Sequence, residues 1–245
     1  MLKEKWGIFK RHFKENFLKA SAVFLAWFIV YNIPHYLPFL KLKIVLDSPS
    51  GILELFFSNI FSLFFIAAFS YVLWIAIILI FDGKLNKTYF FKTAAKQSWF
   101  LVVLFVFEAL MFFNFNILTL TGGSYWQVFD FMTYFNLALG AVKIFFICVF
   151  LITARMGVSL KEGLKEKIKD NWPVFPGFVG GIIVFYIILL TFVWILTTLN
   201  MSRPGGIILS ALMVFASFVT QYGFYVIAPF IALPFVAAPS EKRTE

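Results

Sequence analysis

The amino-acid sequence predicts an all-α polytopic membrane protein with six transmembrane helices. Three observations support this fold class: an excess of apolar residues, six apolar stretches of membrane-spanning length, and basic residues concentrated in alternate connections. Of the 245 residues, 62% are hydrophobic and 13% are charged, whereas soluble domains contain roughly 45–50% apolar and about 25% charged residues. A soluble core of this size cannot bury so much apolar surface, so lipid is expected to solvate the excess.

Six stretches are apolar over the roughly 20 residues that a spanning helix requires. Each stretch is continuous rather than alternating, which excludes transmembrane strands. The predicted spans are 19–40, 52–81, 99–118, 128–153, 174–198 and 206–236. We interpret the first as a membrane helix rather than a cleaved signal, because no small-residue cleavage site follows it. The chain is then a single transmembrane domain, 1–245, ending in a cytoplasmic tail at 239–245.

Lysine and arginine set the predicted orientation. Of the 21 basic residues, 17 precede the first, third and fifth spans or follow the sixth, and such an excess marks the cytoplasmic side. We therefore expect a multi-pass protein in the plasma membrane of a prokaryote, with both ends cytoplasmic. Because the charge follows the topology, we expect it to contact anionic lipids of the inner leaflet, and we expect no nucleic-acid partner.

The basic segments share the pattern Lys-x-x-x-Lys-x-[Asn/Ser]-[Phe/Trp], and each precedes a pair of spans. Lysines four residues apart lie on one helical face, and aromatic residues favour the membrane interface. We predict an amphipathic helix on the inner membrane surface before each hairpin, with a capping box from Ser159 to Glu162 starting the third. The predicted lipid-surface residues are Lys10, Lys14, Phe17, Lys92, Lys96, Trp99, Lys165, Lys169 and Trp172.

One surface helix with an outward and a returning span forms an internal repeat unit. The units are approximately 1–81, 82–153 and 154–238. Two spans per unit give every unit the same orientation, so the repeats are parallel and related by an axis along the membrane normal. The alternative is chance resemblance, because many inner-membrane proteins carry lysine and tryptophan before a span.

Two charged residues lie inside predicted spans, Glu108 in the third and Lys143 in the fourth. A lone charge at mid-bilayer costs about 2.5–3.5 kcal/mol or more. Because these spans form one hairpin, we predict an ion pair between the two residues. The pair is either a functional site, such as a coupling site or polar pathway, or a structural staple. Buried pairs often give no net stability over apolar residues.

Other polar and small residues in the spans are interpreted as packing features. Hydrogen bonds between helices are expected from the amides of Asn59, Asn136 and Gln221. Glu54 and Asp130 are expected at helix N-termini, where the helix dipole favours a carboxylate. Close approach of a neighbouring helix is expected at Gly177, Gly180 and Gly181. Pro229 and Pro234 predict a kink in the last span.

The segment Ser159-Leu-Lys-Glu-Gly-Leu-Lys, followed by Asn171-Trp172 and a span, carries a family resemblance. It resembles poorly characterised prokaryotic six-helix membrane proteins that are similar to the membrane domain of some glycerophosphodiester phosphodiesterases. The resemblance covers most of the chain as a pattern of helices. It implies no catalytic residues, because that membrane domain accompanies the hydrolase and does not contain its site.

The sequence contains no recognisable catalytic motif: no Gly-x-Ser-x-Gly, no His-Glu-x-x-His and no Walker-type nucleotide loop. We therefore expect no enzymatic activity, no cofactor and no metal site. The first hypothesis is a non-enzymatic scaffold or accessory subunit that contacts the inner leaflet through its basic helices, with a membrane-protein partner or a second copy of itself. The alternative is a small-solute or ion transporter or channel component with Glu108 and Lys143 at its centre.

Overall fold

The computed structural model describes residues 2–32, 51–120, 125–198, 215–216 and 218–236, and these are entirely helical apart from short turns. The all-α prediction is confirmed over these residues. Within the described residues, three helices are long and apolar enough to cross a membrane: Asn59–Phe81, Ala138–Met156 and Phe218–Phe235. Lys87–Lys96 and Ser98–Phe112 meet at 65° and together give a fourth candidate. Several helices therefore suit a bilayer.

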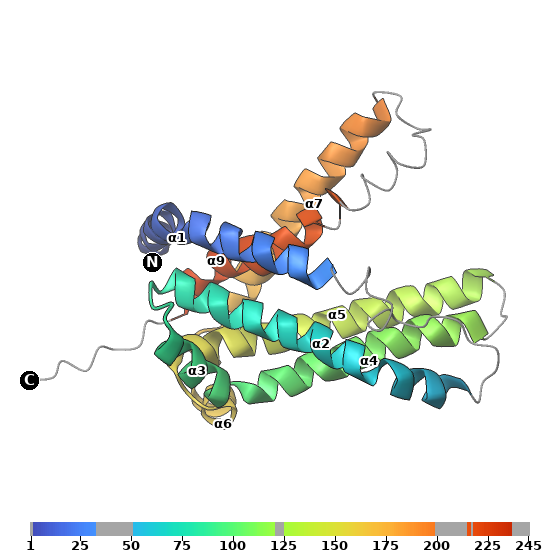
Figure 1. Ribbon diagram of the computed structural model, residues 1–245. Helices are drawn as coiled ribbons and strands as arrows, with labels where there is room; N and C mark the ends of the chain where they lie inside the picture. Colours follow the sequence, from blue (N-terminus) through green and yellow to red (C-terminus); the bar gives the residue numbers. More distant parts are fainter. Residues whose placement is uncertain (1, 33–50, 121–124, 199–214, 217, 237–245) are drawn as a thin grey trace, which may run out of the picture.

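The elements follow one another as alternating outward and returning helices (Figure 1). The first half contains α1 (Leu2–Asn32), α2 (Gly51–Phe81), α3 (Lys87–Lys96) and α4 (Ser98–Leu120). The second half contains α5 (Tyr125–Met156), α6 (Leu160–Glu162), the π-helical turn η2 (Gly163–Lys167) and α7 (Val174–Thr198). The C-terminal helical segment, 218–236, includes π-helical η3 (Gly223–Ile227), α9 (Ala228–Ala232) and 3-10 helical η4 (Leu233–Phe235).

One end of the bundle gathers the short helices and the basic segments (Figure 1). The first turns of α1, all of α3 and α6, and the ends of α2 and α5 lie there, and we call it the basic end. The first turns of α1 run across the rest of that helix, and α3 bends into α4. The third segment differs from the predicted surface helix, because one α-helical turn passes directly into the π-helical turn η2.

The returning helices α2 and α5 end in the same local structure. Gly83 and Gly157 have φ values of 66° and 65°, a left-handed conformation that glycine adopts without a steric penalty. Gly83 N donates to Ile80 O and Lys84 N donates to Leu79 O, which is the Schellman pattern of helix ends. After Gly157 the same pair of bonds recurs. It satisfies carbonyl groups that lack a partner within the helix.

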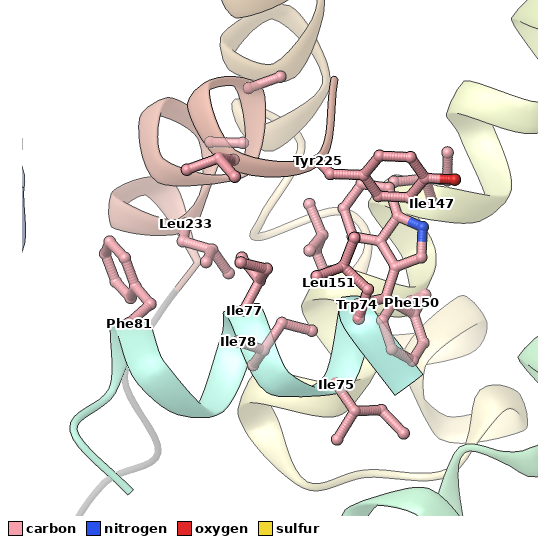
Figure 2. Packing of buried hydrophobic residues seen from close by; sticks show 14 of the residues in the cluster. Trp74, Ile75, Ile77, Ile78, Phe81, Ile147, Phe150, Leu151, Tyr225 and Leu233 are labelled. Carbon is pink, nitrogen blue, oxygen red and sulfur yellow. The ribbon is translucent and has the colours of Figure 1, made fainter. Parts of the chain in front are cut away.

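The core lies where the three hairpins meet, next to the basic end. Figure 2 shows side chains of α2 pointing toward α5 and toward the C-terminal helical segment. Aromatic rings provide much of this contact, and the rings of Phe100 and Phe150 stack with centroids 4.0 Å apart. Large side chains that are fully buried here include Trp74, Phe81, Phe100, Phe150, Phe178 and Phe230.

The glycines of α7 allow the C-terminal helical segment to approach closely. A Cβ at Gly181 would lie 2.8 Å from Ala228 Cα, and one at Gly177 would lie 3.1 Å from Phe235 Cδ2. The predicted close approach is confirmed at both positions, whereas Gly180 has no neighbour within 4 Å. The helix type of the C-terminal helical segment also changes near its prolines. A π-helical turn ends just before Pro229 and a 3-10 turn includes Pro234, adjustments that accommodate the missing proline N–H group.

Candidate functional site

The predicted lipid-surface residues gather on the segments that form the basic end (Figure 1). All six of their lysines are exposed, Phe17 and Trp99 are half-buried, and Trp172 is exposed. Two lysines are engaged by the protein. Lys10 Nζ lies 5.5 Å from the centroid of the Trp6 ring, and Lys96 Nζ donates to Gly157 O at the end of α5.

A buried amide side chain lies where each basic segment enters the bundle. Asn16 Nδ2 donates to Phe81 O at 3.3 Å, and Gln97 Nε2 donates to Val158 O at 2.9 Å. Asn171 Nδ2 donates to Lys167 O at 2.8 Å. The first two bonds close a hairpin, because each joins the entry of an outward helix to the end of the helix that returns.

In the second basic segment the buried amide lies one residue before the position that the lysine pattern assigns to Asn or Ser. That pattern matched Ser98 with Asn171, but Ser98 is exposed whereas Gln97 is 1% exposed. Gln97 and Asn171 each follow the left-handed glycine of the preceding helix by 14 residues. The buried amide and the helix-ending glycine therefore keep a constant spacing in these two segments, which the lysine pattern does not follow.

Arg155 holds the ends of three helices together, a role that the sequence did not indicate. Its Nε donates to Asp82 Oδ1 at 3.1 Å. Its Nη1 donates to Leu233 O, and to Val236 O at 3.0 Å. The guanidinium also lies 5.1 Å from the centroid of the Phe81 ring. Its side chain is only 6% exposed, unlike the exposed lysines of the basic segments.

Glu108 and Lys143 are brought together by the α4–α5 hairpin. Lys143 Nζ lies 3.3 Å from Glu108 Oε1, so the expected ion pair is formed. The two side chains, Lys143 first, are 19% and 20% exposed. The pair is therefore partly accessible from outside the protein, and this arrangement is compatible with both the staple and the polar-site interpretations.

Further polar groups line the faces between helices. Tyr225 Oη donates to Ser70 Oγ at 3.1 Å, linking the C-terminal helical segment to α2. Asn59 is 1% exposed, as expected for an amide between helices. The side chains of Asn136, Glu54 and Asp130 lie outside the part that the structure describes. Within the described part, no group of three histidine, cysteine or acidic side chains is placed to hold a metal ion.

The fold and the basic end define an all-helical protein with several helices suited to a membrane. No protein-family model, curated protein or solved structure matches the chain. We therefore infer its function from its own contacts and charges.

Proposed function

We propose that the chain is a non-enzymatic membrane scaffold or accessory subunit whose basic end binds anionic lipid headgroups of the inner leaflet. The observation that carries this proposal is that three basic segments, each leading into an apolar helix, gather at one end of the bundle. A lysine or arginine near an anionic membrane surface contributes roughly 1 kcal/mol of attraction. The exposed lysines therefore favour the inner leaflet of a prokaryotic plasma membrane.

We also propose that the chain crosses the membrane six times with both ends cytoplasmic. The apolar second half of α1 and the helix α7 would supply two crossings beyond the four candidates. The start of α1 and the ends of α2, α5 and η4 share one end of the bundle, which supports this topology. Each hairpin would then leave the cytoplasmic side and return to it.

The threefold repeat remains part of the proposal and has additional support. The second and third units share a Schellman glycine, an N-cap soon after it and a buried amide at the same spacing. The N-cap predicted at Ser159 is confirmed, because its side chain accepts from Glu162 N at 3.3 Å. Asn86 caps α3 in the same way, accepting from Tyr89 N at 2.9 Å.

Topology can be tested by labelling single cysteines with an impermeant maleimide. Cys148 is the only cysteine of the chain, so Cys148→Ala provides a cysteine-free background. We expect Ser124→Cys to react in intact cells, and Leu85→Cys and Leu164→Cys to react only after the membrane is permeabilised. Labelling of Leu85→Cys from outside would contradict the six-span proposal.

Lipid binding can be tested by measuring how phosphatidylglycerol and phosphatidylcholine raise the unfolding temperature of the detergent-solubilised protein. We expect phosphatidylglycerol to stabilise more. Replacing all six lipid-surface lysines with glutamine should remove the difference between the lipids. Lys41 and Lys43, which the sequence places on the opposite side, serve as the matched control when replaced with glutamine. Equal stabilisation of all variants by both lipids would contradict the proposal.

The partly accessible ion pair supports a second candidate, a small-solute or ion transporter or channel component centred on Glu108 and Lys143. Flux into liposomes that is lost in Glu108→Gln and retained in Lys14→Gln would favour this candidate over the scaffold. The resemblance to a membrane domain that accompanies a hydrolase favours the accessory role instead. In that role a membrane-protein partner, or a second copy of the chain, would bind the bundle.

A further inference from the structure

The helix α3 is less enclosed by protein than the other two basic segments. Among the first turns of α1, His12 stacks on Phe81 with ring centroids 4.4 Å apart, and Asn16 is buried. In the third segment Gly163 is buried, and a Cβ at this position would overlap Thr153 Cγ2. In contrast, α3 contains no buried residue.

The protein alone gives α3 little tertiary support. It is 10 residues long, and isolated helices shorter than about 12–15 residues are marginal in water. Its contacts with the bundle include the partly buried Phe90 and Ala94, and a hydrogen bond from Tyr71 Oη to Ala94 O. Its ring at Phe91 is 60% exposed. A second surface that covers its exposed face would therefore stabilise the helix further.

In the proposed six-span topology, chain connectivity places α3 beside the surface of the bilayer. After a bend of 65°, α3 continues into the apolar helix α4, and α3 and Ser98–Phe112 together give a candidate span. A short helix joined in this way lies at the level where the span enters the headgroup region. An exposed aromatic ring at that level is favoured by the amphipathic interface.

The charge of α3 is unopposed. Between Asp82 and Glu108 the sequence contains four lysines and no acidic residue, and Asp82 is paired with Arg155. In contrast, the first segment contains Glu4 and Glu15, and the third has three acidic residues among its lysines. Of the four lysines, Lys96 donates to Gly157 O. Over the described residues, no hydrogen bond or ion pair engages the side-chain ammonium group of Lys84, Lys87 or Lys92.

We propose that α3 is the principal anionic-lipid site of this protein. Lys84, Lys87 and Lys92 bind phosphatidylglycerol-type headgroups, and Phe91 lies in the interface beside them. The inference rests on the proposed function and deepens it, because it assigns lipid selectivity to one of the three basic segments. The other two segments are held mainly by the protein.

The test places an environment-sensitive dye at single cysteines in the Cys148→Ala protein. Ala95→Cys reports on α3, and Leu164→Cys is the matched control on the third segment, since both positions are exposed. The full chain is reconstituted in nanodiscs of phosphatidylcholine, with or without phosphatidylglycerol. We expect phosphatidylglycerol to shift the dye emission to shorter wavelength at position 95 and to have little effect at position 164.

Lysine substitutions then test the recognition itself. Lys84→Gln, Lys87→Gln and Lys92→Gln should each weaken the apparent affinity for phosphatidylglycerol about fivefold, and their effects should multiply. The matched control is Lys161→Gln, an exposed lysine of the third segment that is not among the six lipid-surface lysines, and it should change this affinity little. Inorganic phosphate added to phosphatidylcholine nanodiscs should give no shift, because the site recognises a headgroup held at a membrane.

The outcomes separate this inference from the proposed function. Equal shifts at the two dye positions, or a shift at position 164 alone, would overturn the assignment to α3 while leaving lipid binding by the basic end intact. No shift at either position would overturn both. A shift with inorganic phosphate alone would overturn the lipid as the ligand.

Discussion

At the scale of single residues, Arg155 contacts the ends of two helices besides its own. Its guanidinium meets the carboxylate just after α2 and the last carbonyl groups of the C-terminal helical segment. A planar guanidinium presents five donors in a fixed geometry, whereas the ammonium group of lysine is a compact point charge. One side chain thereby joins the ends of the three returning helices.

Replacing Arg155 should destabilise the protein strongly. Arg155→Ala leaves Asp82 and the carbonyl groups without their donor, and removing one partner of a buried ion pair typically costs about 3–5 kcal/mol. Arg155→Lys should also destabilise, because it cannot reproduce the multiple contacts. The measurement is thermal unfolding in detergent, with the exposed Arg11→Ala as control. Equal stability of Arg155→Ala and Arg11→Ala would contradict this role.

A double-mutant cycle at Glu108 and Lys143 should reveal coupling. Glu108→Gln and Lys143→Met each leave one charge without its partner, and residues in contact couple by roughly 0.5–3 kcal/mol. The double variant should therefore lose less stability than the sum of the single variants, as measured by unfolding in detergent. Additive losses would show that the 3.3 Å contact does not contribute to stability.

The contacts of Arg155 and the Glu108–Lys143 pair differ in how far the sequence can predict them. A charge within an apolar span requires a partner, and the adjacent span offered Lys143, so the pair could be predicted. Arg155 lies near the basic end, where arginine is normally interpreted as an interfacial residue. Its partner Asp82 is 73 residues away, and the local sequence gives no indication that the two meet.

At the scale of elements, the connectors before α4 and α7 show which sequence signals are reliable. The cap at Ser159 was predicted from local chemistry and is confirmed. In the second basic segment the buried amide lies one residue before the position that the lysine pattern indicates, because lysines on an exposed face are not constrained by packing. Buried Gln97 is constrained, and its spacing from Gly83 was present in the sequence.

The packing of α7 against the C-terminal helical segment predicts unequal effects of two neighbouring substitutions. Gly181→Ala places a Cβ 2.8 Å from backbone Ala228 Cα, and such overpacking typically costs about 1–3 kcal/mol. Gly180→Ala meets nothing within 4 Å and should be neutral or stabilising by up to about 1 kcal/mol. Thermal unfolding in detergent measures both. A larger loss in Gly180→Ala would show that the helices pack differently.

At the scale of the whole molecule, the composition predicted the helical class. The number of membrane crossings depends on the residue at which each surface helix ends and each span begins. In α1 the basic first turns and the apolar second half belong to one uninterrupted helix that bends between them, so no break in the sequence marks the transition. In the second unit the bend between α3 and α4 marks it clearly. The threefold arrangement is therefore better supported by the second and third units than by the first.

A circular permutant tests the repeat at this scale. The start of α1 and the end of η4 lie at the basic end, so a flexible linker can join the old ends while a new start is made at Lys84. If every unit leaves and returns on its own, the permutant should keep its orientation. Maleimide labelling of Ser124→Cys and Leu164→Cys in the Cys148→Ala background would report the orientation of the permutant. If the two positions exchanged their accessibility, the units would not insert independently.

The hydrogen bonds that close the first two hairpins also bear on synthesis. Asn16 meets Phe81 O, and Gln97 meets Val158 O, across 65 and 61 residues. Each loop is therefore complete well before the ribosome reaches the end of the chain, so each hairpin can close soon after it is inserted. The bonds from Arg155 to Leu233 and Val236 form only when the final segment arrives. Assembly would then proceed hairpin by hairpin, and the bonds of Arg155 would form last and join the ends of the assembled helices.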